Sequence, residues 1–189
     1  MGSLSQIQLA VIIGSLLGDG YIRTIPGRKN SFLEINHSIK QKEYVDWKYE
    51  ILKEITVSGP KSRIIDKVRT AYRFYTKQLP ELTQLEKRFY QNGKKVIPND
   101  LIISPLSLAV WFMDDGSKCR ECDVYLNTQQ FGLEDQMRLL DTLKAFNIDA
   151  RLNKDKVYKR IRFMKSSLAQ FRNLVKPYII PSMKYKIEI

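Results

Sequence analysis

The sequence predicts an α+β protein made of two pseudosymmetric halves, each ordered helix, strand, strand, helix, strand, strand, helix. Two observations predict this fold class. A nine-residue apolar run ending in Asp-Gly occurs at 12–20 and again at 108–116, so that Asp115 lies 96 residues after Asp19 in a chain of 189. The segments after each run then repeat the same order of strand-like and helix-like patterns.

The two apolar runs are predicted to be helices. Ser3 can cap the first helix, and Ser104 can cap the second, with Pro105 at the first helical position. Gly20 and Gly116 follow the two runs, where a glycine in the left-handed conformation commonly ends a helix. We therefore expect one motif helix at the start of each half.

The remaining elements follow in the same order in both halves. Alternating polarity predicts strands at 32–37 and 124–129, and helical periodicity then predicts helices at 42–55 and 134–146. Basic strand regions follow at 61–77 and 150–165. Each half ends with an amphipathic stretch, at 79–90 and at 167–175. No Gly/Ser-rich linker separates the halves, so we expect them to pack together. The predicted boundaries are 1–91 for the first half, 92–103 for the connector and 104–189 for the second half.

A stripe of small residues marks the first motif helix. Ala10, Gly14 and Gly18 recur every fourth residue and would allow a second helix to approach closely. The second motif helix carries Val110 and Asp114 where the first has Gly14 and Gly18. We therefore expect a close but asymmetric contact between the two helices.

The charge of the chain indicates a polyanionic partner. It has 32 Lys and Arg against 20 Asp and Glu, a net charge of +12, while its 43% hydrophobic content is too high for a disordered basic tail. Nucleic acid is the commonest such partner, and an acidic membrane surface is the next. The longest uncharged apolar stretch, 9–18, is about half of the ~20 residues that a membrane span needs, and no secretory leader is expected.

The two cysteines do not predict a metal site. Cys119 and Cys122 form one Cys-x-x-Cys pair, but a structural zinc site usually has four ligands, and the single histidine, His37, lies far away in the sequence. We interpret both as ordinary loop cysteines.

The acids at the ends of the motif helices indicate catalysis. The helix dipole disfavours a carboxylate at a helix C-terminus by about 0.3–1 kcal/mol. The second motif helix nevertheless ends in two acids, Asp114 and Asp115. One Asp-Gly pair is an ordinary turn, but two at half-chain spacing predict a shared site between the halves. Carboxylate and carbonyl oxygens are the ligands that Mg²⁺ prefers, and such a pair could clamp a phosphodiester.

The segments 14–20 and 108–116 resemble the two LAGLIDADG motifs of single-chain homing endonucleases. The resemblance extends to 94–99, 104–108, 126–129, 176–181 and 183–186, and it is looser between 21 and 90. It implies two αββαββα halves with the motif helices packed at the centre. Each half would contribute a four-stranded antiparallel sheet to a saddle over the DNA major groove.

The resemblance also implies an activity. The chain would be a monomeric, metal-dependent, site-specific DNA endonuclease that acts in intron homing. It would cut both strands of a long asymmetric double-stranded target and leave short 3′ overhangs, without a protein partner. Mg²⁺ would be the physiological cofactor, with Mn²⁺ or Ca²⁺ as non-physiological substitutes, and the location would be an organelle that encodes it.

The family pattern carries over to individual site residues. The metal would be held by the carboxylates of the two motif acids and by the carbonyls one residue earlier: Asp19, Asp115, Gly18 and Asp114. Two basic residues, Lys95 and Lys186, fall beside the reacting groups and would stabilise developing charge or poise a water. Gln129 and His37, placed at matching strand positions, would orient water.

Basic and polar residues on the strands are the predicted DNA contacts. In the first half they are Arg23, Arg28, Lys29, Arg63, Lys67, Arg69, Arg73, Tyr75 and Lys77, and in the second half Arg151, Asn153, Lys154, Lys156, Tyr158, Arg160 and Arg162. Alternate strand residues share a face, so Arg73, Tyr75 and Lys77 are expected on one side. Arginine would read guanine, Asn would read adenine, and Lys would mostly hold phosphate.

Two alternatives to cleavage remain. The same scaffold could serve as an RNA maturase, with its own intron RNA as partner, or as a DNA-binding protein that does not cut. The presence of both acids and both lysines argues against a loss of catalysis. A basic ribosomal or general RNA-binding protein would require the paired motifs to be a coincidence.

Overall fold

The computed structural model describes residues 4–120 and 123–188, and the predicted element order occurs in both halves. The first half comprises α1 (Gln6–Leu17), β1 (Tyr21–Thr24), β2 (Ser31–Ser38), α2 (Lys42–Leu52), β3 (Lys61–Ile64), β4 (Thr70–Tyr75) and α3 (Pro80–Phe89). The second comprises α4 (Pro105–Asp115), β7 (Gly116–Arg120), β8 (Asp123–Leu126), α5 (Leu133–Lys144), β9 (Ala150–Asp155), β10 (Tyr158–Phe163) and α6 (Leu168–Val175). A small hairpin of β5 (Tyr90–Gln91) and β6 (Lys94–Lys95) lies between them.

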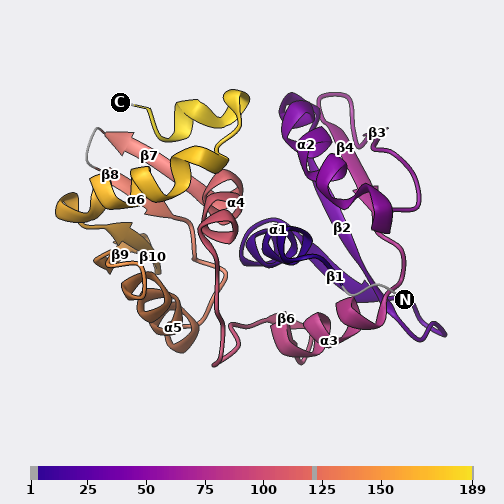
Figure 1. Ribbon diagram of the computed structural model, residues 1–189, viewed down its shortest axis with the longest axis horizontal. Helices are drawn as coiled ribbons and strands as arrows, with labels where there is room; N and C mark the ends of the chain where they lie inside the picture. The colour runs from indigo at the N-terminus through magenta and orange to yellow at the C-terminus, as the bar shows by residue number, and fades with distance from the viewer. Residues whose placement is uncertain (1–3, 121–122, 189) are drawn as a thin grey trace.

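Each half contains one four-stranded antiparallel sheet. The strand orders are β1-β2-β4-β3 and β7-β8-β10-β9, so the two sheets have the same topology. The helices α1 and α4 pack against each other at the centre of the molecule, with one sheet on either side (Figure 1). The α+β fold class and the central packing of the motif helices are confirmed.

The helix starts are set by serine caps. Ser5 caps α1 and forms a reciprocal capping box with Gln8, whereas Ser3, the predicted cap, lies outside the described residues. Ser104 caps α4 with Pro105 at the first helical position, as predicted. Ser104 also forms a capping box, and both boxes satisfy backbone N–H groups that would otherwise lack partners at the start of a helix.

Glycine is needed after each motif helix because neighbouring atoms leave no room for a Cβ, and not because the backbone there is left-handed. Gly116 continues into β7 with φ −71°, and the described glycines with positive φ are Gly27 and Gly93. A Cβ at Gly116 would lie 2.3 Å from the Phe112 carbonyl oxygen, and one at Gly20 would lie 2.8 Å from atoms of residue 15. The predicted left-handed caps at positions 20 and 116 are therefore wrong.

The stripe of small residues on α1 is where α4 approaches. A Cβ at Gly14 would lie 2.5 Å from the Ser107 carbonyl oxygen and 2.6 Å from Val110 Cβ. A Cβ at Gly18 would lie 2.4 Å from Asp114 Cβ. The predicted close and asymmetric helix contact is confirmed, because α4 fills with side chains the space that α1 leaves open.

The core runs from both sheets to the central helices. Residues of α4 such as Trp111 and Phe112 are fully buried, and Phe112 packs edge-on against Phe171 of α6. Within 4–120 and 123–188, none of the helices has both the length and the apolar character of a membrane span. Cys119 is an exposed free cysteine on β7, and Cys122 lies outside the described residues.

Candidate active site

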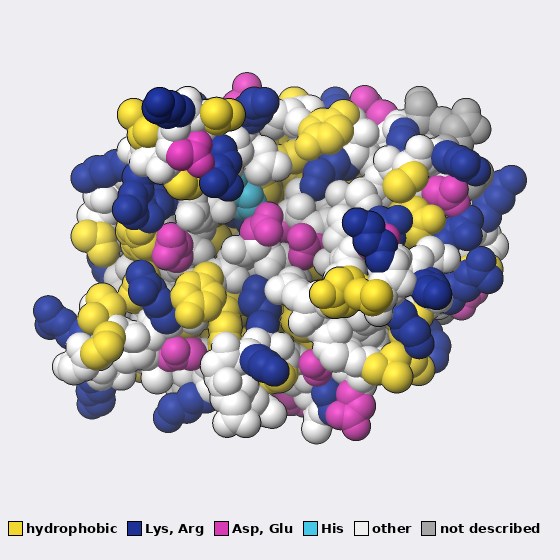
Figure 2. Space-filling view, turned by 180° about the vertical axis from the view of Figure 1, so that it is seen from behind, with side chains coloured by type: hydrophobic (Ala, Val, Ile, Leu, Met, Phe, Trp, Pro, Cys, Tyr) yellow, Lys and Arg dark blue, Asp and Glu magenta, His cyan; other side chains and the backbone are white. Residues whose placement is uncertain are grey.

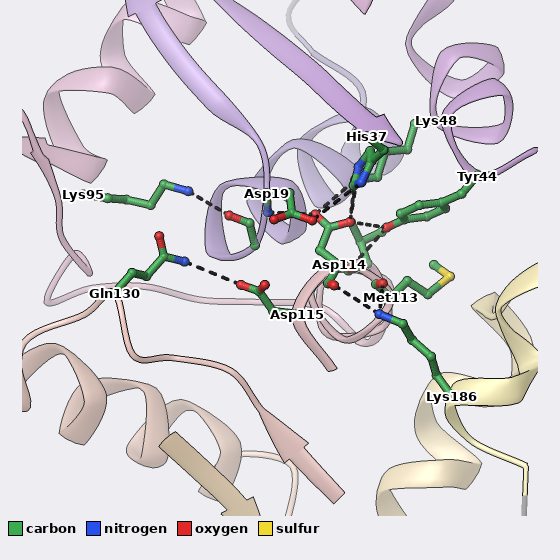
Figure 3. A network of polar contacts seen from close by, with 12 residues as sticks. Asp19, His37, Tyr44, Lys48, Lys95, Met113, Asp114, Asp115, Gln130 and Lys186 are labelled. Atoms are coloured by element: carbon green, nitrogen blue, oxygen red, sulfur yellow. Dashed lines mark hydrogen bonds and ion pairs between the residues drawn. The ribbon is translucent and has the colours of Figure 1, made fainter. Parts of the chain in front are cut away.

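Three carboxylates gather where the two central helices end. Asp19 follows α1, whereas Asp114 and Asp115 are the last residues of α4 (Figure 3). The Asp19 side chain is 48% exposed, while the Asp114 side chain is fully buried. The close packing of α1 on α4 thus brings together acids that lie about half the chain apart.

Each half directs one lysine at the carbonyl that precedes its motif acid. The Lys95 ammonium, carried by β6, donates to the carbonyl oxygens of Gly18 at 2.8 Å and Gly20 at 3.0 Å. The Lys186 ammonium, from a C-terminal 3₁₀ turn at 181–186, donates to the carbonyl oxygen of Asp114 at 3.1 Å and to that of Met113. The structure therefore brings both predicted lysines to the site in equivalent arrangements.

Burial and crowding perturb the ionisable groups of the site. Burial raises the pKa of Asp115 to about 7, and the charges of Asp19 and Asp114 act in the same direction. Burial lowers the pKa of Lys95 and of Lys186, although the neighbouring acids oppose it. A raised acid pKa and two lowered amine pKa values are typical of sites that bind cations or move protons.

His37 lies against the first-half acid. Its side chain is 3% exposed, its Nδ1 is 3.6 Å from Asp19 Oδ2, and its Nε2 is 3.8 Å from Asp114 Oδ1 without a hydrogen-bond partner. Burial, followed by the positive charge of Lys48, lowers the pKa of His37. The lowered pKa favours the neutral form of the imidazole beside Asp19.

Gln129 does not occupy the position that corresponds to His37. With Asp19 matched to Asp115, Tyr21 corresponds to Ser117. Pairing places Tyr21 opposite Glu34 and Ser117 opposite Tyr125, so that the residue equivalent to His37 is Thr128. Gln129 lies one residue further along, in a turn.

The amide of Gln129 is engaged elsewhere. Its Nε2 donates to Asp155 Oδ2 at 2.8 Å, while the neighbouring Gln130 Nε2 lies 3.5 Å from Asp115 Oδ2. The predicted match of His37 and Gln129 is therefore off by one residue. The two strands approach the site after connections of different length, a difference that the offset of 96 residues does not reveal.

Lys48 and Tyr44 on α2 are site residues that the sequence analysis missed. The Lys48 ammonium is fully buried and lies 2.8 Å from Asp114 Oδ1, and the Tyr44 hydroxyl donates to the same oxygen at 2.7 Å. Burial alone would raise the pKa of Asp114, but Lys48, His37 and these hydrogen bonds together lower it. The available cue was a lysine within the buried stripe of α2, which also contains Val45 and Leu52.

The oxygens of the site suit a hard divalent cation. Ligand atoms of Asp19, His37 and Asp114 lie within 4.8 Å of one another. The Asp114 carboxylate is already bonded by Lys48, Tyr44 and the Asp19 N–H, so it is the least available of the three. Asp115, the other predicted ligand, is not part of this cluster, although its carboxylate is close enough to respond to the charge of Asp19. Carboxylate and carbonyl oxygens are the ligands that Mg²⁺ and Ca²⁺ prefer.

The open face of the first sheet groups several of the predicted DNA contacts. Strand pairing and alternation place Arg23, Arg63, Arg73 and Tyr75 on the same side. The Arg73 guanidinium lies 5.3 Å from the centre of the Tyr75 ring, and Glu34 lies 3.7 Å from Arg73 and 4.0 Å from Arg23. The acid and the ring hold these guanidinium groups over the sheet.

The second sheet presents a similar face. Arg160 pairs with Asn153 and Arg162 pairs with Arg151, and alternation adds Tyr158 to that side. The Arg160 guanidinium lies 3.9 Å from the centre of the Tyr125 ring and donates to Asn127 Oδ1 at 3.2 Å. Seen from behind, acidic side chains lie near the middle of the molecule, with Lys and Arg on both sides (Figure 2).

The other predicted contacts lie outside these two faces. Loops between strands carry four of them: Arg28, Lys29, Lys67 and Arg69. Lys154 alternates with Asn153 and points to the opposite side, and Lys156 lies in the β9–β10 turn with φ 54°. Lys77 does not share the face of Arg73 and Tyr75, because β4 ends at Tyr75 and the Lys77 ammonium donates to the Glu54 carbonyl oxygen at 2.8 Å.

The chain belongs to the LAGLIDADG DNA endonuclease family, whose model matches residues 9–171. It is 34% identical over 200 residues to "Probable intron-encoded endonuclease 1" of Wickerhamomyces canadensis, covering 98% of this chain and 85% of that protein. It is 31% identical over 196 residues to "Cytochrome b mRNA maturase bI2" of Debaryomyces hansenii, covering 97% and 74%. Family and fold together define a single-chain LAGLIDADG homing endonuclease, which is a site-specific DNA endonuclease.

Solved structures share the architecture. The homing endonuclease I-WcaI bound to its DNA recognition sequence superposes with a TM-score of 0.92 at 32% identity, covering 100% of this chain and 89% of that chain. I-DmoI in complex with DNA and Ca superposes with a TM-score of 0.57 at 14% identity, which shows a common fold.

Proposed function

We propose that this chain hydrolyses one phosphodiester bond in each strand of a long, nearly asymmetric duplex target, with Mg²⁺ as its physiological cofactor and short 3′ overhangs as the product. One observation carries the proposal. A motif acid and a lysine directed at the preceding carbonyl occur together twice, as Asp19 with Lys95 and as Asp115 with Lys186. Two centres, each with an acid and a lysine, match the two DNA strands to be cut.

In this mechanism the two motif acids would hold the metal, together with the carbonyl oxygens of Gly18 and Asp114. The metal would supply neutralisation of phosphate charge and a more acidic bound water. Lys95 and Lys186 donate to those carbonyls, and their ammonium groups would stabilise the negative charge that develops on the scissile phosphates. His37 would hold the Asp19 carboxylate and the water beside it. Mn²⁺ or Ca²⁺ could replace Mg²⁺ in solution.

The two sheets would hold the duplex as a monomer without a protein partner. Arg73 on the first open face and Arg160 on the second are each held against an aromatic ring and are suited to direct contacts with guanine. The lysines in the loops would mainly bind phosphates, which makes affinity fall with salt. The structure of I-WcaI bound to its DNA recognition sequence supports this arrangement.

The names of the relatives support an origin within an intron and, with it, an organellar location. The Wickerhamomyces protein is named as intron-encoded and the Debaryomyces protein as an mRNA maturase. The second name favours one further candidate function, namely help in splicing with the chain's own intron RNA as partner.

Selection from a randomised duplex library tests the proposed function. Targets bound in EDTA are cloned into supercoiled plasmid and incubated with the chain in Mg²⁺ or in EDTA. Linear plasmid with 3′ overhangs is expected in Mg²⁺, and binding without cutting is expected in EDTA. Bound targets that stay intact in Mg²⁺ would favour a non-cleaving DNA-binding protein, and selective binding of intron RNA would favour the maturase.

A further inference from the structure

The side chain of Asp114 contributes to the half opposite the one that carries it. Its carboxylate accepts hydrogen bonds from the Asp19 backbone N–H at 3.2 Å and the Tyr44 hydroxyl at 2.7 Å, and from Lys48 at 2.8 and 3.1 Å. These three residues belong to the first half. The Asp114 carbonyl, in contrast, accepts from Lys186 near the C-terminus. One residue of α4 therefore supports both centres through different groups (Figure 3).

The crossing of Asp114 into the first half depends on a glycine. A Cβ at Gly18 would lie 2.4 Å from Asp114 Cβ, so a side chain there would close the path. Gly18 is also the α1 counterpart of Asp114, and it has no carboxylate with which to support the second centre. His37 adds to this difference, since its counterpart, Thr128, has no imidazole and a buried hydroxyl without a partner. The two centres are thus built unequally.

We propose that Lys48 is a positioning residue for the first-half centre, acting through Asp114 on Asp19. This inference rests on the proposed cleavage function and assigns a role that only one of the two centres contains. Lys48 contacts both carboxylate oxygens from a fully buried position, which fixes the rotation of the Asp114 carboxylate. One of these oxygens then holds the Asp19 N–H, and His37 lies between the two acids.

As a consequence, cleavage of the two DNA strands should depend on Lys48 to different extents. The Lys48–Asp114 pair holds the backbone N–H of Asp19 and thereby positions this residue, whereas the Lys186 contact at the second centre uses a backbone carbonyl of α4. Loss of the Lys48 ammonium should therefore disturb cleavage of one strand much more than cleavage of the other. A shift of about 1 Å in a reacting group can cost 10- to 100-fold in rate, so about a tenfold change in the ratio of strand rates is expected.

A duplex target with a different fluorophore on each strand measures this ratio. Single-turnover rate constants for the two strands are compared in wild type, Lys48→Met and Tyr44→Phe, with enzyme in excess and at temperatures at which each variant is folded. We expect Lys48→Met to change the ratio about tenfold and Tyr44→Phe, which removes one hydroxyl, to change it in the same direction by less. The matched control is Lys53→Met, which removes an exposed lysine near the end of α2 and should leave the ratio unchanged.

A general loss of stability would not produce this result, because both centres share the packing of α1 on α4. Binding of the target in EDTA should stay within about twofold, since the buried Lys48 cannot contact phosphates. Equal slowing of both strands, or an unchanged ratio in both variants, would overturn the role of Lys48, and Tyr44→Phe keeps the test valid if Lys48→Met does not fold. A wild-type chain that cuts neither strand would instead contradict the proposed function.

Discussion

Replacing Asp115 by asparagine is expected to stabilise the metal-free protein while it abolishes cleavage of the duplex. Asp115 is crowded by Asp19 and Asp114 and partly buried, and its pKa is raised from 3.8 to about 7. An acid whose folded pKa is raised destabilises the folded state as pH rises from about 4 to about 7, because the unfolded chain releases the proton first. Above about pH 8, where the folded group is also deprotonated, the penalty is constant.

The size of this penalty follows from the two pKa values. Each unit of pKa corresponds to about 1.4 kcal/mol, so the penalty is at most about 4 kcal/mol at pH 8 and about 1.6 kcal/mol at pH 5. Solvent reaches part of the Asp115 side chain and screens some of this interaction. We therefore expect the stability gain of Asp115→Asn to grow by about 1–2 kcal/mol between pH 5 and pH 8.

Urea denaturation in EDTA at pH 5, 6, 7 and 8 measures the gain. Asp141→Asn is the matched control, since Asp141 is exposed and paired locally with Lys144, and its effect should be below about 0.5 kcal/mol. A gain for Asp115→Asn that does not change with pH, or a loss of stability at pH 8, would refute the electrostatic reasoning.

Three further stability predictions follow from the packing. Gly14→Ala should lower the free energy of unfolding by about 1–3 kcal/mol, because its Cβ would lie 2.5 Å from the Ser107 carbonyl oxygen, whereas Gly59→Ala, with 3.8 Å to its nearest neighbour, should have little effect in the same urea titration. Lys48→Met should cost about 3–5 kcal/mol by leaving the Asp114 carboxylate buried without its cation, and a midpoint like that of Lys53→Met would contradict this expectation. Ser104→Ala should cost about 1 kcal/mol through loss of the cap of α4, a change that thermal unfolding can resolve; an unchanged midpoint would show that the cap does not contribute.

The sequence predicts the repeated architecture well because the repeat and the polarity patterns are local properties. The element order, the serine cap of α4 and the close contact at Gly14 could all be inferred from neighbouring residues. The roles of Gly20 and Gly116 could not, because their requirement comes from contacts with the preceding helix turn and not from their own backbone angles.

The details of the site depend on three-dimensional register, which a single offset cannot provide. Thr128, and not Gln129, stands in for His37 because the strand connections of the two halves differ in length. In the sequence, Lys48 resembles the many exposed lysines of a basic chain, and only the fold brings its ammonium to 2.8 Å from Asp114 Oδ1. The role of the Asp114 side chain could not be predicted either, since its partners Tyr44 and Lys48 lie about 70 residues away in the sequence.

The two motif acids would make this DNA-binding protein a nuclease. The most direct test measures cleavage of a selected target in Mg²⁺ by wild type, Asp19→Asn, Asp115→Asn and the double variant, alongside binding in EDTA. Each single variant and the double variant should lose double-strand cleavage, while all four proteins should still bind the target. Wild-type cleavage of both strands by the Asp19→Asn, Asp115→Asn double variant would contradict it.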